Sequence, residues 1–234
     1  MLCDDLLEYY ARQVIIKNIG EGGQARLMKT KIAMVGLGGI ANHLLPLLVG
    51  AGIKKIIFID DDIVEKTNLH RQLMFRQHDI GVKKTIAATS YLEKMNEAMA
   101  ITIYHQKITS IDDKKIFQDV DIICEGSDDF QTKLLCDKIS QTINKPIIIG
   151  AAAGYDGQVG IFHHSALRYG DIFKHSNAVE VASCASVGIM NSTLAQVSGL
   201  MAQLFFDYIF DKKPKTRFFM IDRCQTIELT PNHK

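Results

Sequence analysis

One polar segment contains the residue types that phosphate chemistry needs. The stretch "IDDDIVEKTNLHRQ" (59–72) places three consecutive aspartates, Asp60 and Asp62 among them, ahead of Asn68 and Arg71. Adjacent carboxylates repel one another unless a cation, a base or a ribose lies nearby. An arginine here can stabilise charge that develops on transferring or leaving phosphates, which a redox dinucleotide enzyme does not require. The alternative is a solvated acidic loop followed by a charged helix.

Two further stretches place charges where a phosphate or a metal ion would lie. In "GVKK", Lys83 and Lys84 open a predicted helix, where a cation is unfavourable for the helix dipole unless an anion is bound. By local pattern alone, however, a solvated lysine is the preferred interpretation. In "EGSDDFQTK", Asp128 follows a predicted strand, so it could hold Mg²⁺ outside the carboxyl edge of a sheet. An aspartate that caps the next helix explains the same pattern equally well.

A glycine turn precedes these charges. The residues "VGLGGIA" (35–41) follow a strand pattern and open a helix pattern, with glycines at Gly36, Gly38 and Gly39. Glycines let a backbone approach a phosphate, and the helix N-terminus supplies free N–H donors. Asp60, about 20 residues further on, lies where an acidic residue binds ribose hydroxyls. The turn therefore predicts nucleotide binding without identifying the nucleotide, and a turn without a ligand is the alternative.

The elements that would position these residues alternate along the chain. Strand patterns occupy 32–35, 55–59, 101–105, 120–124 and 146–149, and helix patterns occupy 40–51, 82–98, 114–118 and 130–143. This alternation predicts an α/β fold with a Rossmann-like, doubly wound and mostly parallel sheet. Residues 5–29 predict N-terminal helices interrupted by "GEGG" (20–23). In the C-terminal third, a strand at 157–162, a helix at 186–210 and a hairpin of 217–221 with 226–229 predict antiparallel strands that extend the sheet.

Composition excludes several classes of protein. The 234 residues have a formal net charge of +1, which gives no support for nucleic acid or a membrane surface as a partner. No apolar run approaches the roughly 18 residues of a membrane span, so we expect a cytoplasmic protein. Five scattered cysteines favour neither a disulfide framework nor a Cys-rich zinc site. The polar segment 163–182 has no clear period and is an ordered lid, a substrate-binding segment or partly disordered.

Taken together, the motifs resemble the ThiF/MoeB/HesA-type adenylyltransferases, bacterial relatives of the ubiquitin-activating enzymes. "YYARQVIIKNIGEGGQARL", "VGLGGI", "IDDDIVEKTNLHRQ", "GVKK", "SDDFQTK" and "PIIIGAAAGYDGQVGIF" are similar to the family's motifs in order and spacing. The resemblance covers nearly the whole chain. "NLHRQ" after "D-x-D-x-V" is its most specific element, whereas the glycine turn alone is weak.

The resemblance implies ATP-dependent adenylation of the C-terminal diglycine carboxylate of a small ubiquitin-like sulfur carrier, for sulfur transfer in thiamin or molybdopterin biosynthesis. It implies one adenylation domain over 1–234, with N-terminal helices (1–30), a nucleotide-binding core (31–150) and a carrier-binding extension (151–234). It also implies ATP and Mg²⁺ as cofactors and a homodimer. By motif, the residues implied at the nucleotide are Gly36, Gly38, Gly39, Asp60, Asp62, Asn68, Arg71 and Lys84. Asp128 would hold Mg²⁺, Arg12 would reach the neighbouring subunit's ATP site, and Cys184 would be a nucleophile or sulfur acceptor after adenylation.

Two departures from the family pattern qualify these implications. The chain lacks the two C-x-x-C pairs that hold a structural zinc in many relatives, so we expect no zinc. The irregular set His163, His164, His175 and Cys184 is a poor substitute. Tyrosine at Tyr9 replaces an arginine of the N-terminal motif, so one contact at the phosphates or at the dimer interface would be lost. The alternative functions are adenylation of another carboxylate, on a peptide precursor or a modified tRNA base, and a nucleotide-binding scaffold that has lost catalysis.

Overall fold

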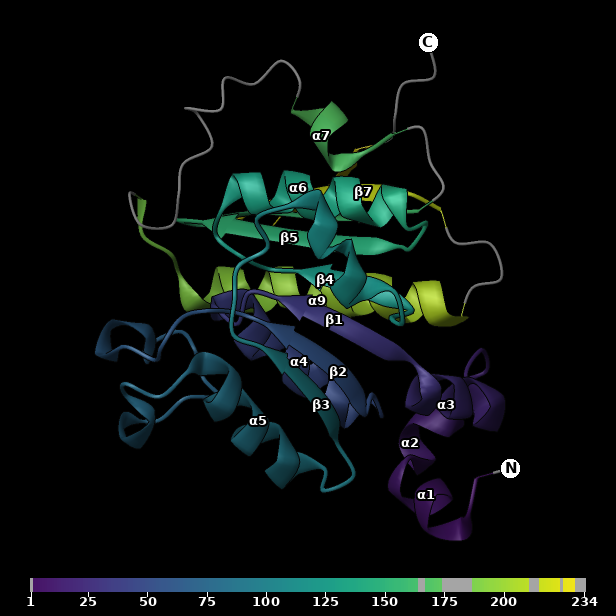
Figure 1. Cartoon of the computed structure of the whole chain (residues 1–234). Helices are drawn as coiled ribbons and strands as arrows, with labels where there is room; N and C mark the ends of the chain where they lie inside the picture. The colour runs from purple at the N-terminus through teal and green to yellow at the C-terminus, as the bar shows by residue number, and fades with distance from the viewer. Residues whose placement is uncertain (1, 164–166, 174–186, 211–214, 224, 230–234) are drawn as a thin grey trace.

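The computed structural model describes residues 2–163, 167–173, 187–210, 215–223 and 225–229. Its centre is an eight-stranded sheet with the order β3-β2-β1-β4-β5-β6-β7-β8 (Figure 1). The strands are β1 (Lys31–Val35), β2 (Lys55–Ile59), β3 (Ala100–Tyr104), β4 (Ile122–Glu125), β5 (Ile147–Ala153), β6 (Asp156–Phe162), β7 (Arg217–Asp222) and β8 (Gln225–Leu229).

The sheet has a parallel half and an antiparallel half. The pairs β3–β2, β2–β1, β1–β4 and β4–β5 are parallel, and β5–β6, β6–β7 and β7–β8 are antiparallel. Buried β-branched runs such as "KIIFI" in β2 are typical of parallel strands covered on both faces. The predicted doubly wound sheet with antiparallel C-terminal strands is therefore confirmed, and so is the C-terminal hairpin.

Helices cover both faces of the sheet. The helical elements are α1 (Asp4–Tyr9), α2 (Ala11–Val14), α3 (Gly20–Lys29), α4 (Gly39–Gly50), η1 (Lys66–Asn68), η2 (Gln77–Asp79), α5 (Lys84–Met95), η3 (Ile111–Phe117), α6 (Phe130–Thr142), α7 (Tyr169–Ile172) and α9 (Asn191–Phe210). One core cluster joins α4, α5 and α9 to the sheet, and a second joins α6, α7 and η3 to the opposite face. Figure 1 shows α6 and α9 on opposite sides of β5.

The N-terminal helices differ from the prediction in one respect. The "GEGG" stretch does not interrupt the helical region but forms the first turn of α3, and the break lies between α2 and Gly20. Gly20 has a φ of +57°, which lets the chain change direction there at little steric cost. A Cβ on Gly23 would lie 3.1 Å from the ring of Phe210, so this glycine permits close packing between α3 and α9.

Two other predicted helices change in type or extent. The 114–118 pattern lies within the seven-residue 3₁₀ helix η3, whose start is fixed by the Ser110 N–H bond to Asp113 and the Asp112 N–H bond to the Ser110 hydroxyl. The 186–210 pattern begins its continuous helix only at Asn191. Of the 163–182 segment, residues 163 and 167–173 are described, so whether it is an ordered lid remains untested. Among the described helices, none combines the length and the hydropathy that a membrane crossing requires.

Candidate functional site

A cavity of about 1220 Å³ opens at the carboxyl edge of the parallel strands. Its lining comprises the glycine turn, the residues that follow β2 and β4, and the start of α5. It continues along the antiparallel half past Ala151–Ala153, Asp156–Gln158 and Met220–Asp222. Ligand pockets for single small molecules usually occupy about 300–1000 Å³. The cavity therefore has room for a nucleotide and for an additional substrate segment beside it.

The three glycines of the turn have three different roles. Gly36 has a φ of +79°, and a Cβ there would lie 2.8 Å from the backbone N and Cα of Ser127. A Cβ on Gly39 would instead meet the Leu194 side chain at 2.5 Å, so Gly39 allows α4 to pack on α9. Gly38 lines the cavity, and nothing lies within 4 Å of its Cβ position. Gly38 thus leaves open space where a phosphate would approach the N-terminus of α4.

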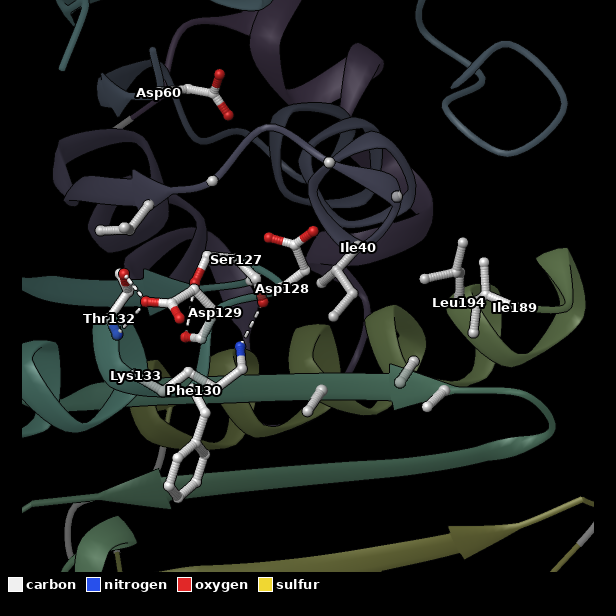
Figure 2. Close-up of a pocket in the computed structure, with 18 of the residues that line it drawn as sticks. Ile40, Asp60, Ser127, Asp128, Asp129, Phe130, Thr132, Lys133, Ile189 and Leu194 are labelled. Carbon is white, nitrogen blue, oxygen red and sulfur yellow. Dashed lines mark hydrogen bonds between the residues drawn. The ribbon is translucent and has the colours of Figure 1, made fainter. Parts of the chain in front are cut away.

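Asp60, at the end of β2, holds the turn in place. One carboxylate oxygen accepts the Leu37 N–H at 2.6 Å and the other accepts the Asp62 N–H at 2.9 Å. The residue is only 9% exposed, and burial raises the pKa of its carboxyl, opposed by the Leu37 N–H and by Lys84. Asp60 faces the cavity (Figure 2). It therefore anchors the glycine turn and still presents oxygen lone pairs where a ribose would lie.

Lys84 forms an ion pair on the rim of the cavity. Its ammonium lies 2.7 Å from Asp62 Oδ2, and the exposed fractions of the two side chains are 8% and 58%. The Lys84 N–H also donates to the backbone oxygen of Asp62. This pairing supplies the anion that a cation in the first turn of α5 requires. It gives Lys84 a protein partner in addition to any phosphate.

The "NLHRQ" segment contributes three polar residues to the lining of the cavity. Asn68 is buried, and its Oδ1 accepts the Glu65 N–H at 3.1 Å. The Arg71 guanidinium donates to the backbone oxygen of Thr67 at 2.8 Å. The side chain of Gln72 is buried, yet its Oε1 has no hydrogen-bond partner among the described residues. All three residues line the cavity, and the Gln72 oxygen is open to a hydrogen bond from water or from a ligand there.

The two aspartates of "SDD", in the loop after β4, have different roles. Asp129 caps α6: its Oδ2 accepts the Thr132 N–H at 2.7 Å and the Thr132 hydroxyl at 2.6 Å. The Thr132 hydroxyl chiefly lowers the pKa of the Asp129 carboxyl. Asp128 lines the cavity and is exposed, as Figure 2 shows. The cap alternative considered for Asp128 is therefore wrong, because Asp129 is the residue that caps the helix.

The residues that line the cavity are suited to bind a nucleotide together with Mg²⁺. Among the described residues no cluster of three His, Cys, Asp or Glu side chains forms a metal cage. Mg²⁺ bound to a nucleotide normally uses one or two carboxylates together with substrate phosphates and water. A single exposed carboxylate beside open space at Gly38 matches that requirement.

One predicted site residue, Arg12, is not brought to this cavity. Arg12 is exposed on α2, and α3 leads from there directly into the amino end of β1. The cavity lies at the carboxyl end of the same strand, about 16 Å further along for five residues. Figure 1 shows α1–α3 at the edge of the sheet from which β1 starts. Cys184, like His164 and His175, lies outside the described residues, so its role and the substitute zinc site stay untested.

Two buried polar residues at the site, Asn42 and Lys133, are absent from the set predicted from the sequence. Asn42 in α4 donates to the carbonyls of Leu37 (3.1 Å) and Gly38 (2.9 Å) and accepts the Met74 N–H at 2.9 Å. It thereby ties the glycine turn to the segment after Gln72. Lys133 in α6 is buried against Glu125. The available signal was the residue type: an asparagine within an apolar helix pattern, and a lysine in a first helical turn.

Comparison with known proteins gives concordant matches. The sequence profile of the ThiF family matches residues 10–233. The sulfur carrier protein adenylyltransferase of Thermus thermophilus is 34% identical over 203 residues, which is 84% of this chain and 75% of that protein. The adenylyltransferase and sulfurtransferase MOCS3 of Culex quinquefasciatus is 31% identical over 195 residues, 82% of this chain but 44% of that protein. The chain thus spans less than half of the MOCS3 protein.

Solved structures agree on the fold. The crystal structure of Escherichia coli MccB with AMPCPP and MccA superimposes with a TM-score of 0.77 at 22% identity. The match covers 96% of this chain and 74% of that chain. At this identity the likeness concerns the fold alone.

Proposed function

The chain belongs to the ThiF family and is an adenylyltransferase, and from this premise we propose that it adenylates the C-terminal carboxylate of a small ubiquitin-like sulfur carrier. ATP is the second substrate, and pyrophosphate and an acyl-adenylate are the products. Sulfur transfer to the carrier then follows, for thiamin or molybdopterin biosynthesis. One observation carries the proposal: Gly38, Asp60, Arg71, Lys84 and Asp128 line a single cavity. The name of the Thermus relative supports the substrate class.

The chemistry needs charge compensation more than proton transfer. A C-terminal carboxylate is already ionised near neutral pH, so it attacks the α-phosphorus without a general base. The P–O bond to the β-phosphate breaks, and pyrophosphate leaves with that electron pair. Arg71 and Lys84 offset the repulsion between the carboxylate and the phosphates. Asp60 binds the ribose, Asn68 contacts the phosphates together with these two cations, and Gly36 borders the nucleotide site.

Asp128 is the proposed magnesium ligand. When bound, Mg²⁺ neutralises charge on the phosphate oxygens and orients them. Asp62 keeps Lys84 beside the phosphates through the 2.7 Å ion pair. Gly39 contributes indirectly, since it lets α4 lie against Leu194.

We propose a homodimer in which Arg12 acts on the partner's site. Arg12 is far from its own cavity, at the other end of β1, and it lies on an exposed segment. Ile15 and Ile16 beside it are 74% and 52% exposed, and exposed apolar groups that cluster in this way often mark an interface. A second copy that covers this segment would bring the guanidinium to a neighbouring cavity.

The part of the cavity along β5, β6 and β7 supports a substrate-binding role for residues 151–234. Ala151–Ala153 and Gly157 line it with small side chains, which leaves room for an extended peptide tail. We accordingly propose one adenylation domain over 1–234, with helices at 1–30, a nucleotide-binding core at 31–150 and this carrier-binding extension.

Pyrophosphate exchange tests the proposal. The protein with Mg-ATP, labelled pyrophosphate and a diglycine-ending carrier should incorporate label into ATP, and a carrier that lacks its last two glycines is the matched control. Exchange that occurs equally with both carriers, or with neither, contradicts carrier adenylation.

Cys184 requires a separate experiment. We propose that it attacks the adenylate or accepts sulfur, and a lowered thiol pKa would be needed for either role. Attack of the Cys184 thiolate on the acyl carbon would form a thioester with the carrier and release AMP, so mass spectrometry of the protein with carrier and ATP should detect a thioester adduct that Cys184→Ala abolishes. Sulfur acceptance is tested separately by adding a sulfane-sulfur donor, such as a persulfidated protein, and should give a persulfide that the same substitution abolishes. Exchange activity that survives in the variant, with no adduct in either protein, assigns Cys184 no chemical role.

A peptide carboxylate is the second candidate substrate. The fold likeness to MccB in a structure with MccA favours it, and the exchange assay run with synthetic peptides distinguishes it. A modified tRNA base has less support, because the net charge of +1 gives no sign of an RNA partner. A scaffold without catalysis is disfavoured by the intact charges at Arg71, Lys84 and Asp128.

A further inference from the structure

Lys133 is a buried cation whose bonding capacity is fully used inside the protein. Its side chain is 4% exposed, in the first turn of α6. The ammonium donates to Glu125 Oε2 at 2.6 Å, to the Ser127 carbonyl at 2.6 Å and to the Gly150 carbonyl at 2.8 Å. A lysine ammonium has three donors, so each has an acceptor. Lys133 thus joins the end of β4 and the middle of β5 to the loop between β4 and α6.

Glu125 holds the same loop from the other side. Its side chain is fully buried, and its Oε1 accepts the Ser127 N–H at 2.9 Å and also the Ser127 hydroxyl. The N–H, the hydroxyl and the carbonyl of Ser127 are therefore all bound by the Glu125–Lys133 pair. Asp128 is the next residue, and Asp129 beyond it is fixed as the cap of α6. The backbone of Asp128 is held on both sides, as Figure 2 shows.

Ser127 also sets the distance between two walls of the cavity. The glycine turn packs on it so closely that a Cβ on Gly36 would lie 2.8 Å from its backbone. The turn and the Asp128 carboxylate therefore share Ser127 as their common support. A shift of Ser127 would move Asp128 relative to the phosphates that the turn is proposed to bind.

Stability alone does not account for this pair. Buried ion pairs are often matched or exceeded in stability by apolar residues of similar volume, and a lysine in a first helical turn opposes the helix dipole. We propose that Lys133 is a positioning residue, which with Glu125 fixes Ser127 and so aims Asp128 at the metal–phosphate end of the nucleotide. This inference rests on the proposed function, because it takes Asp128 as the magnesium ligand.

The test measures how much Mg²⁺ strengthens ATP binding. For each protein the dissociation constant for ATP is measured by calorimetry in EDTA and again in excess Mg²⁺, without a carboxylate substrate, and the ratio is the magnesium enhancement. We expect Lys133→Met to reduce this enhancement about tenfold, because loss of a group that orients a metal ligand typically costs about 10- to 100-fold in metal affinity. The constant in EDTA should stay unchanged within about twofold. Lys133→Arg keeps the cation and should retain most of the enhancement.

Two further variants separate positioning from folding. Glu125→Gln/Lys133→Met removes both charges, which avoids an unpaired buried carboxylate, and should melt near the wild type while still losing enhancement. Lys138→Met, at an exposed position on the same helix, is the matched control and should change nothing. In an Asp128→Asn background, Lys133→Met should cause no additional loss, because its effect acts through Asp128.

The results decide whether Lys133 positions Asp128. The inference is overturned if the magnesium enhancement is undiminished in Lys133→Met and in Glu125→Gln/Lys133→Met. It is also overturned if Lys133→Met causes a loss of the same size in the Asp128→Asn background. In either case the Glu125–Lys133 pair is purely structural. A wild type that binds ATP and exchanges pyrophosphate without any magnesium enhancement overturns the inference alone. A wild type that binds no ATP overturns the proposed function as well.

Discussion

Two buried lysines border the cavity, and each is paired with a carboxylate in a different environment. Lys84 on the rim pairs with Asp62, whose side chain is 58% exposed. Lys133 beneath the cavity pairs with Glu125, which is fully buried, and also bonds two carbonyls. An exposed carboxylate can be resolvated by water when its partner turns to a ligand, whereas a buried one cannot. Lys84 is thus able to exchange partners, and Lys133 is fixed.

This difference divides the site into a reactive rim and a rigid base. The rim supplies the charges that would act on phosphates, and the base keeps the walls of the cavity at a constant separation. Substitutions at the rim should therefore change activity more than stability, and substitutions at the base should change stability as well. Four substitutions test this division.

Lys133→Met should produce the largest loss of stability. Removing one partner of a buried ion pair leaves an uncompensated charge and typically costs about 3–5 kcal/mol. The burial that already raises the pKa of the Glu125 carboxyl would then act without the opposing Lys133 charge. Thermal unfolding should show a fall in Tm of roughly 10 °C, and most of it should be recovered in Glu125→Gln/Lys133→Met. A variant that melts like the wild type would remove the distinction between the two lysines.

Lys84→Met should have the opposite profile. Loss of a cation at the phosphates should lower pyrophosphate exchange about 100- to 1000-fold, by analogy with lost oxyanion donors. The cost in stability should stay below about 1 kcal/mol, because its partner Asp62 is largely hydrated. Steady-state exchange and thermal unfolding on the same sample check both parts. If exchange were retained while the Tm fell, Lys84 would belong to the structural base.

Asp129→Ala should cause an intermediate loss of stability, because Asp129 caps α6 in the rigid base of the site. Loss of the cap should cost about 1 kcal/mol of stability at neutral pH. The pKa of Asp129 is lowered from its ordinary value of 3.8, so its contribution is present above that value and is lost as the pH falls through the lower native pKa. Urea unfolding of the wild type and of Asp129→Ala measures the free energy of unfolding at neutral pH and at about pH 3. The difference between the two proteins should be smaller in acid. Asp129→Asn, which can still cap, should keep most of the stability.

The parallel half of the fold was predictable because β1, β2, β4 and β5 are largely buried apolar runs that alternate with helix patterns. The position of the charges relative to these strands also predicted one shared cavity, as Asp60 after β2 and Asp128 after β4 illustrate. The helical pattern at 114–118 is confirmed, although it forms a 3₁₀ helix that begins earlier, at Ile111. The interruption expected at "GEGG" was wrong because Gly23 is required for packing on Phe210, which is distant in sequence.

The partners of the charges were not predictable in the same way. The bond from Lys133 to the Gly150 carbonyl and the bond from Asn42 to Met74 join residues 17 and 32 positions apart. No local periodicity encodes such contacts, since they depend on how separate elements meet. The choice between Asp128 and Asp129 as the helix cap likewise depended on geometry that two adjacent, identical residues do not reveal.

A third pair, in the antiparallel half, should show the smallest effect and calibrates the other two. The Arg217 guanidinium on β7 contacts both carboxylate oxygens of Glu228 on β8, at 2.8 and 3.2 Å, but both side chains are more than a third exposed. Glu228→Gln should therefore cost only about 0.2–1 kcal/mol, and molar salt should reduce the cost further. The Arg217 hydrogen bond lowers the pKa of Glu228 from 4.5, so this small contribution is present above that value and is lost as the pH falls through the native pKa. Chemical denaturation with and without salt measures it. A cost as large as that of Lys133→Met would show that exposure does not govern the energetics of these pairs, and the division between rim and base would lose its physical foundation.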